Sequence, residues 1–187
     1  MDKFLIVGLG NPEEKYKNTR HNIGFEILDF ICKKNESKFE TNRLGELAKI
    51  SIKGRKVLLL KPSTYMNLSG KSVIYWMKQE NININRILII SDDLNLPLSK
   101  IRYRANGSSG GHNGLENIEY YLNTNKYSRL RIGISNPKNQ TNQVDFVLGL
   151  FESEEYDLLF SNFNMLSDSI KSFVLSGIND TMNNFNN

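Results

Sequence analysis

Two short apolar runs constrain the fold of this chain more than any other feature. Lys3–Gly8 is apolar and ends in glycine, and residues 86–90 form a β-branched run that ends in Ser91-Asp92-Asp93. Short continuous apolar runs are typical of strands that are buried on both faces, as parallel strands are beneath helices. The sequence therefore predicts a central sheet that is flanked by helices.

Helical and strand-like patterns are mixed along the rest of the chain. Two runs that flank Lys53-Gly54-Arg55 predict a hairpin. Strands mixed with helices favour a single-domain α/β sandwich with a mixed, mostly parallel central sheet. We expect one domain over residues 1–182 and a frayed Asn-rich tail over 183–187. The expected elements are helices over 22–33, 71–79, 115–122, 143–151 and 152–177, and strands over 46–52, 56–61, 100–104 and 129–134.

Composition places the chain among ordinary globular proteins. Of its 187 residues, 39% are hydrophobic and 24% are charged, and no run of about 18 apolar residues could span a bilayer. With one cysteine and no signal-peptide pattern, we expect a cytoplasmic protein. The net charge of +4 permits a polyanionic partner without requiring one. Two histidines and one cysteine are too few for a usual zinc site, so we expect no metal and no cofactor.

A histidine at the start of the first predicted helix is the main catalytic candidate. His21 lies in the polar stretch Thr19-Arg20-His21-Asn22. A helix N-terminus disfavours added positive charge, which helps to keep an imidazole neutral near pH 7. Neutral imidazole is the form that a general base needs. The alternative is a histidine with a structural role only.

Two carboxylates follow the second apolar run, at the edge of the sheet where open α/β folds place their sites. Because side chains alternate along a strand, only one of Asp92 and Asp93 is expected to face a given site. Three interpretations remain open. The pair could bind Mg²⁺, one aspartate could accept the Nδ1 proton of a histidine, or both could lie in a solvated turn before Pro97.

Two glycine-rich segments match well-known motifs only in part. Gly8-Leu9-Gly10-Asn11-Pro12 has Glu13 where a dinucleotide fingerprint needs a third glycine, so we expect either a structural turn or a turn that presents Asn11. Residues 107–111 match G-x-S-x-G, but the loop is too long for a nucleophile elbow and the only later histidine is His112. A mobile lid ending in His112-Asn113 is favoured over a Ser109 nucleophile.

Basic residues alternate along two predicted strands. Lys100, Arg102 and Arg104 share one strand face, and Arg129 and Arg131 share another. These cations either protect an exposed sheet edge or grip phosphates. In the polar loop of residues 61–70, Asn67 could point into a cleft, while Ser69 could cap the following helix.

Six of these stretches occur in a characteristic order and spacing. They are residues 7–12, Tyr16 with 19–24, 61–70, 92–97, 110–115 and 129–134. Together they resemble the bacterial-type peptidyl-tRNA hydrolase family, and the ordered set is far more specific than any single motif. The resemblance implies a monomeric α/β enzyme that cleaves the ester between a peptide and the 3′ ribose of tRNA. This reaction recycles tRNA after premature release from ribosomes.

The resemblance also implies a role for each matching residue. His21 would be the catalytic base and Asp92, rather than Asp93, its partner. The peptide end would be bound by three asparagines, with two further residues at the same cleft and two arginines at the tRNA 5′-phosphate region. The asparagines are Asn11, Asn67 and Asn113, the cleft residues Tyr16 and His112 (the latter on the lid), and the arginines Arg104 and Arg131.

The chain departs from the family's pattern at three places. Glu13 replaces the usual glycine after Asn-Pro, Asn95 replaces a common acidic residue, and Leu98-Ser99 replaces a Pro/Gly-rich turn. Three rival classes remain: a serine esterase using Ser109, a magnesium-dependent phosphohydrolase using Asp92 and Asp93, and a non-catalytic RNA-binding module.

Overall fold

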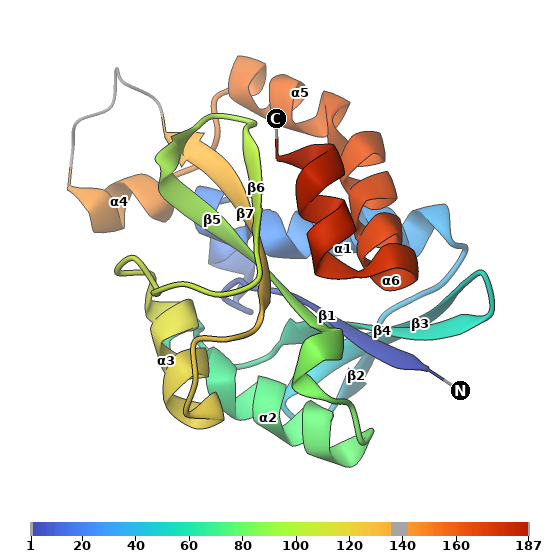
Figure 1. The fold of residues 1–187 in the computed structure, drawn as a ribbon. Coiled ribbons are helices and arrows are strands. Elements are labelled where there is room, and N and C mark those ends of the chain that lie inside the picture. The colour runs from blue at the N-terminus through green and yellow to red at the C-terminus, as the bar shows by residue number, and fades with distance from the viewer. Residues whose placement is uncertain (1, 136–141, 187) are drawn as a thin grey trace.

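The structure, a computed structural model, describes residues 2–135 and 142–186. Seven strands form one sheet in the order β2-β3-β4-β1-β5-β7-β6 (Figure 1). The four central strands β4, β1, β5 and β7 are mutually parallel, and the outer pairings β2–β3, β3–β4 and β6–β7 are antiparallel. The predicted α/β sandwich with a mixed central sheet is confirmed.

In the first two thirds of the chain the bounds of the elements follow the predictions closely, apart from β2 and β5. The strands are β1 (Lys3–Gly8), β2 (Glu40–Asn42), β3 (Gly45–Ile52), β4 (Arg55–Pro62), β5 (Ile87–Pro97), β6 (Ile101–Arg104) and β7 (Ser128–Ser135). The helices are α1 (Ile23–Lys34), α2 (Ser69–Gln79), α3 (Asn113–Leu122), α4 (Gln143–Val147), α5 (Ser153–Ser161) and α6 (Phe163–Phe185). Short 3₁₀ turns are η1 (Glu14–Tyr16), η2 (Arg20–Asn22), η3 (Met66–Leu68) and η4 (Ile84–Arg86).

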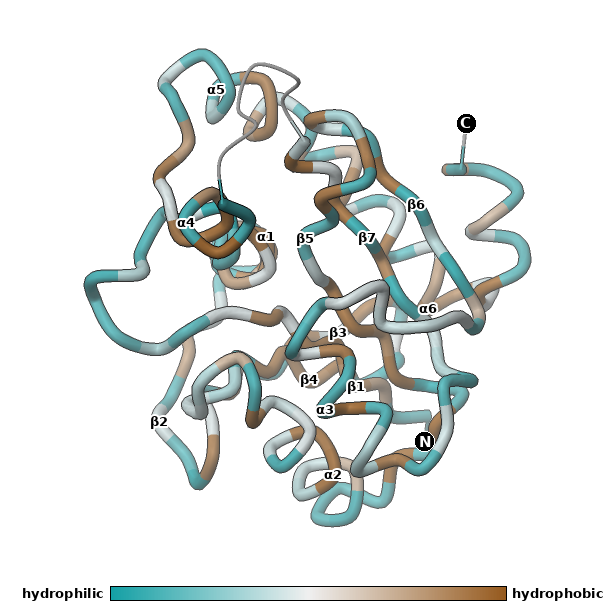
Figure 2. Tube along the Cα trace, turned by 90° about the vertical axis from the view of Figure 1, so that its left-hand side faces the viewer, coloured by the Kyte–Doolittle hydropathy of each residue, from teal (hydrophilic) through white to brown (hydrophobic). Residues whose placement is uncertain are grey.

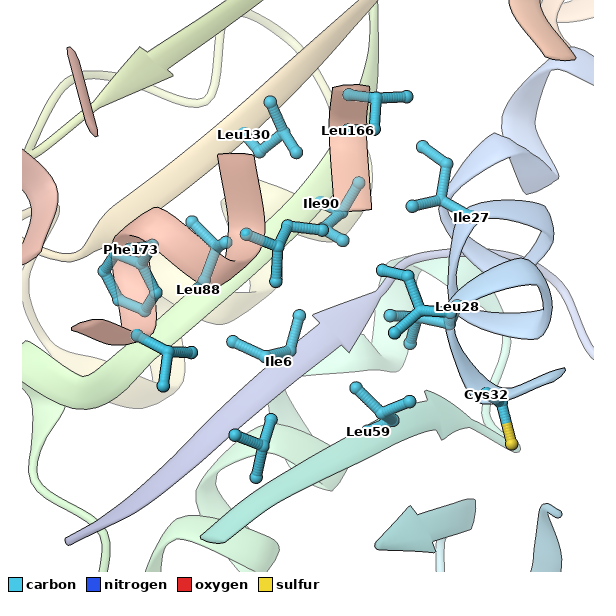
Figure 3. Close-up of a cluster of buried hydrophobic side chains, with 14 of the residues drawn as sticks. Ile6, Ile27, Leu28, Cys32, Leu59, Leu88, Ile90, Leu130, Leu166 and Phe173 are labelled. Atoms are coloured by element: carbon cyan, nitrogen blue, oxygen red, sulfur yellow. The ribbon is translucent and has the colours of Figure 1, made fainter. Parts of the chain in front are cut away.

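Helices cover both faces of the sheet, which explains why its central strands are continuously apolar. Phe4 and Ile6 of β1 pack into a core beneath α1 and α6, whereas Leu5 and Val7 pack into a second core beneath α2 and α3. The hydrophobic stretches concentrate on the central strands (Figure 2). Side chains of the first core, including Ile6 from β1, meet α1 and α6 (Figure 3).

The first helix meets the first strand without any intervening side chain. A Cβ added to Gly8 would lie 2.2 Å from the carbonyl oxygen of Gly24, and one added to Gly24 would lie 2.6 Å from the nitrogen of Leu9. Atoms at those distances would overlap, so only glycine permits this approach of α1 to the sheet. The turn η2, which directly precedes α1, is thereby held at the carboxyl ends of the central strands.

Strand β5 is longer than predicted. It continues through Asp92 and Asp93, which are both buried, to Pro97, and its register with β7 shifts between Asp93 and Pro97. The interpretation of these carboxylates as a solvated turn is therefore wrong. Their charges are tolerated in the strand because each has a partner from another element, as described below.

The C-terminal third differs most from its predictions. The expected helix over 143–151 ends at Val147, and the expected helix over 152–177 divides into α5 and α6 near Asn162. Helix α6 is interrupted by a kink at Gly177, whose φ of 83° is not helical, and its second helical segment runs from there to Phe185. The tail was expected to fray, but the side chain of Asn186 accepts a hydrogen bond from the nitrogen of Tyr103 at 2.6 Å and donates one to its carbonyl oxygen at 3.0 Å.

Candidate active site

Polar side chains from three elements meet where the parallel strands end. His21 lies in η2, Asp92 lies in β5, and His112 is the N-cap residue of α3. Such a crevice at the carboxyl ends of parallel strands is where α/β folds bind their ligands. The cavity there is lined by these three residues together with Asp93, Leu94, Asn95, Ser109, Gly110, Gly111, Asn113, Leu115, Arg131, Gln143, Val144 and Val147.

The two adjacent carboxylates of β5 serve different partners. The Nδ1 atom of His21 lies 2.9 Å from both carboxylate oxygens of Asp92. Asp93 instead pairs with Arg131, at 2.9 Å between Oδ2 and Nε, and its Oδ1 accepts a hydrogen bond from the nitrogen of Asn95. The two carboxylates therefore do not combine into the Mg²⁺ site that was one interpretation of the sequence.

The pair formed by His21 and Asp92 has a defined proton arrangement. A carboxylate that stays ionised can only accept, so the Nδ1 atom of His21 carries the proton and its Nε2 atom has a free lone pair. Burial alone lowers the pKa of His21, but the charge and hydrogen bond of Asp92 outweigh it and raise this pKa above its ordinary value. Burial raises the pKa of Asp92, yet the two histidines reverse this and hold it well below its usual range.

The second histidine is fixed to the same carboxylate. The Nε2 atom of His112 lies 2.9 Å from Oδ1 of Asp92, and its Nδ1 atom accepts hydrogen bonds from the nitrogens of Gly114 and Leu115 at 3.1 and 3.3 Å. Because Nδ1 accepts, the single proton of neutral His112 lies on Nε2. His112 thus caps helix α3 and anchors the Gly-rich loop of residues 105–112, a contact that the sequence did not predict.

His21, Asp92 and His112 are also close enough to be considered as metal ligands. Their potential ligand atoms all lie within 4.8 Å of one another. A nitrogen that binds a metal must offer a lone pair, while in this arrangement both nitrogens that face Asp92 carry protons. Binding through Nε2 of His112 would moreover leave its Nδ1 proton facing two backbone N–H donors. The donor set therefore fits a hydrogen-bonded cluster better than a metal centre.

Asn11 is locked into place by a second asparagine. The nitrogen of Asn11 donates to Oδ1 of Asn22, and Nδ2 of Asn22 donates to the carbonyl oxygen of Asn11, both at 2.9 Å. The Oδ1 atom of Asn11 accepts from the nitrogen of Met66 at 2.8 Å, so its Nδ2 amino group is the part left to face a ligand. Asn22 has a positioning role that sequence reasoning missed, because only tertiary contact reveals it.

Not every predicted site residue shares the cavity of His21. Asn113 and Arg131 line it together with His112. Asn11 lines a different hollow, while Asn67 is exposed on η3 and Tyr16 is half-buried on η1. Arg104 is exposed on the edge strand β6.

One of the five strand cations does not belong to an exposed basic face. Arg129 is only 1% exposed, and its guanidinium donates to the carbonyl oxygens of Ser108 and Asn125 at 2.9 and 3.0 Å. Both expectations for Arg129, edge protection and phosphate contact, are therefore wrong, because the Gly-rich loop folds over it. The strand register places Arg102 opposite Arg131 and Arg104 opposite Arg129.

Ser109 lacks the neighbour that a nucleophile needs. Its Oγ accepts a long hydrogen bond, 3.4 Å, from the nitrogen of Gly111. The nearest histidine in sequence, His112, has Nδ1 engaged by backbone donors and Nε2 engaged by Asp92. The Nε2 atom of His21, in the same cavity, is not hydrogen-bonded to Ser109 either. Within the described residues neither histidine is thus paired with Ser109, which argues against the serine-esterase alternative.

The fold and the site together define a class: an α/β enzyme with a buried histidine–aspartate pair in the crevice of its parallel strands. The sequence profile of the peptidyl-tRNA hydrolase family matches residues 5–187. The chain is 50% identical over 184 residues to the peptidyl-tRNA hydrolase of Phocaeicola vulgatus, covering 98% of each chain. It is 41% identical to that of Clostridium acetobutylicum, covering 98% and 97%.

A solved structure supports the same assignment. The crystal structure of peptidyl-tRNA hydrolase from Acinetobacter baumannii matches with a TM-score of 0.91 and 36% sequence identity, covering 98% of this chain and 94% of that one. The chain therefore belongs to the peptidyl-tRNA hydrolase family, whose members are hydrolases that act on ester bonds. The resemblance inferred from the ordered motifs is confirmed.

Proposed function

We propose that this chain hydrolyses the ester bond between a peptide, or another N-blocked aminoacyl group, and the 3′ ribose of tRNA, with His21 as the general base. The observation that carries the proposal is the hydrogen bond from Nδ1 of His21 to buried Asp92. It fixes the tautomer whose free Nε2 can take a proton from water. General-base assistance of this kind contributes about 10²–10⁴-fold in rate.

Amide groups near the cavity would bind the acyl part of the substrate. Asn113 lines the cavity, and the free Nδ2 group of Asn11 lies on the turn that Asn22 holds beside His21. In our proposal, these N–H groups stabilise the negative charge that develops on the carbonyl oxygen, while Asn67 and Tyr16 contact the peptide. As the bond from the carbonyl carbon to the ribose 3′-oxygen breaks, that oxygen takes the proton that His21 has removed from water. An ester oxygen leaves more readily than an amide nitrogen, so the step needs no covalent nucleophile.

Two arginines would bind the tRNA part. Arg131 lines the cavity from β7, so it can meet phosphate oxygens next to the reacting centre, whereas Arg104 is exposed on β6 and can meet phosphate oxygens farther away. We further propose that the chain acts as a monomer in the cytoplasm and recycles tRNA from stalled translation. None of the described helices is long and apolar enough to cross a membrane.

The test compares variants on N-acetyl-aminoacyl-tRNA. We expect His21→Ala to lower kcat by about 10²-fold or more while full-length tRNA still binds, because the variant loses the base and no tRNA contact. Ser109→Ala is the matched control in the same cavity and should stay within a few-fold of wild type. Activity of His21→Ala within tenfold of wild type would refute the base assignment.

Two further arms separate the rival classes. Wild-type activity that survives exhaustive chelation argues against a magnesium-dependent phosphohydrolase. Aminoacyl-tRNA with a free α-amino group should be cleaved slowly, because an ammonium group does not satisfy amides that are arranged to bind a peptide bond. Equal rates on blocked and unblocked substrates would contradict the proposed role of the asparagines.

A further inference from the structure

We propose that Arg20, through its buried ion pair with Glu155, is a positioning residue that fixes the base-bearing turn against one wall of the catalytic cavity. The inference rests on the proposed role of His21, which directly follows Arg20 in η2. It assigns a function to the one charged side chain of η2 that the mechanism above does not use.

The guanidinium of Arg20 is enclosed by α4, by α5 and by the segment that connects them. Its Nη2 atom lies 2.7 Å from Oε2 of Glu155, and both side chains are 6% exposed. Its Nη1 atom donates to the carbonyl oxygen of Phe146 at 3.4 Å, and its Cζ atom stands 4.3 Å from the centre of the Phe146 ring. The ring of Phe151 lies on the guanidinium as well, at 5.4 Å.

Backbone contacts join the same two segments. The nitrogen of Arg20 donates to the carbonyl oxygen of Gly149 at 3.0 Å, and Thr19 forms an antiparallel bridge with Leu150. A Cβ on Gly149 would lie 3.1 Å from Nη1 of Arg20, so a larger residue there would push the guanidinium. The turn η2 and the α4–α5 connection therefore form one packed unit, although they are more than 120 residues apart in sequence.

This unit has the catalytic cavity at its surface. Gln143, Val144 and Val147 of α4 line the cavity, and Phe146 of the same helix contacts Arg20. Any shift of Arg20 would therefore move α4 relative to His21. The distance between the base and this wall determines where a substrate carbonyl can sit.

Physical chemistry favours a positioning role over a stabilising one. Burying an ion pair removes two charges from water, and apolar residues of similar shape often stabilise a fold as well or better. A guanidinium differs from an apolar side chain because its N–H donors form a rigid fork, which fixes the directions in which its hydrogen-bond partners must lie. Arg20 uses that fork on two partners from different elements, a carboxylate and a backbone carbonyl.

The experiment separates stability from position by replacing both partners. Arg20→Met and Glu155→Met are measured singly and together for thermal unfolding, for kcat and KM on N-acetyl-aminoacyl-tRNA, and for the pH dependence of kcat/KM. We expect each single variant to lose stability, because one buried charge loses its oppositely charged partner. We expect the double variant to recover its Tm to within a few degrees of wild type, yet to keep a kcat about ten- to 10²-fold lower.

A pH profile supplies a readout that a purely structural role would not move. If η2 loosens, His21 separates from Asp92, and the acid limb of kcat/KM moves to lower pH in the double variant. Recovery of kcat together with Tm, or an unshifted acid limb, would overturn the proposal. Phe173→Leu, in the core beneath α6, is the control for lost stability alone and should leave kcat and the acid limb unchanged well below its Tm.

Failure of this inference is distinguishable from failure of the proposed function. If His21→Ala remains active, the base assignment fails, whatever the Arg20 variants do. If His21→Ala is inactive and the double methionine variant is as active as wild type, only the positioning role fails.

Discussion

A single carboxylate, that of Asp92, accepts hydrogen bonds from two imidazoles. Its Oδ1 atom lies 2.9 Å from Nδ1 of His21 and 2.9 Å from Nε2 of His112, and the two rings stand 4.9 Å apart. Asp92 therefore orients both histidines at once, and the Gly-rich loop is anchored to the same atom as the proposed base. Changing Asp92 should affect the protonation of His21 as well as its position.

We predict that Asp92→Asn lowers kcat by about 10²-fold or more, because the fixed tautomer of His21 is lost, and moves the acid limb of kcat/KM to lower pH. The base must be unprotonated, so wild-type activity rises with pH through the raised pKa of His21. Without the charge of Asp92, burial remains and lowers that pKa. Measuring kcat/KM on N-acetyl-aminoacyl-tRNA between pH 5 and 9 would follow the limb.

The matched control is Asp93→Asn, which removes a charge from the neighbouring residue. Asp93 contacts Arg131 rather than His21, so the acid limb should stay in place whatever happens to KM. A limb that moves equally in both variants would mean that the net charge of the cavity, and not the contact with Asp92, sets the pKa of His21.

The sequence predicts individual site residues where they lie in a recognisable motif or at the end of an apolar strand. His21 and the two aspartates of β5 stand out locally, and the preference for Asp92 came from the family resemblance. The buried state of Arg129 and the contact of His112 with Asp92 depend on how the Gly-rich loop folds back over β7. No local pattern specifies that path, because it results from contacts between segments distant in sequence.

At the scale of elements, local rules worked where one segment carries its own signal. The hairpin of β3 and β4 turns at Lys53 and Gly54, which both have positive φ, as a two-residue turn of this kind requires. Strand β2 was missed because its residues, Glu40–Asn42, are exposed and polar, and only pairing with β3 makes them a strand. Strand β5 was predicted too short because its buried polar residues are satisfied by partners that the sequence does not place.

The backbone of Tyr103 in the edge strand β6 is hydrogen-bonded by the side chain of Asn186, which directly follows α6. We predict that Asn186→Ala lowers the free energy of unfolding by about 1–2 kcal/mol, because the two hydrogen bonds to the backbone of Tyr103 are lost. Urea unfolding at an unchanged m-value would measure this difference as a lower midpoint.

Asn183→Ala is the same substitution one turn earlier, at an exposed position of α6. Because alanine favours helices slightly more than asparagine does, its midpoint should be unchanged or slightly raised. If both variants unfolded at the wild-type midpoint, the contacts of Asn186 with β6 would contribute nothing to stability.

At the scale of the whole molecule, the excess of four positive charges matters less than where the arginines stand. Arg131 lies in the cavity beside Asp93, whereas Arg104 is exposed on the edge strand. The two should therefore respond differently to the size of the substrate. Only a long substrate can reach Arg104, while a short one still meets Arg131.

We predict that Arg104→Ala raises KM several-fold for full-length N-acetyl-aminoacyl-tRNA but not for a short N-acyl-aminoacyl nucleotide. For this variant, the slope of log(kcat/KM) against the logarithm of the salt concentration should be shallower by about the amount that one phosphate contact contributes. Arg131→Ala should raise KM for both substrates. Arg86→Ala removes one charge at the opposite end of β5, where Arg86 pairs with Asp2, and should change neither KM. Equal effects of Arg104→Ala on both substrates would refute phosphate contact at this residue.

The junction of Gly8 and Gly24 has a consequence for how such a chain can change over generations. A single methyl group at either position overlaps backbone atoms of the opposite segment, so neither residue can be exchanged in one step without lifting α1 from the sheet. Lifting α1 would carry the adjoining turn, and His21 with it, away from Asp92. Many core side chains can be exchanged one at a time because their neighbours repack around them. Gly8 and Gly24 should stay glycine in related sequences, because no single substitution at either position keeps the backbone contact.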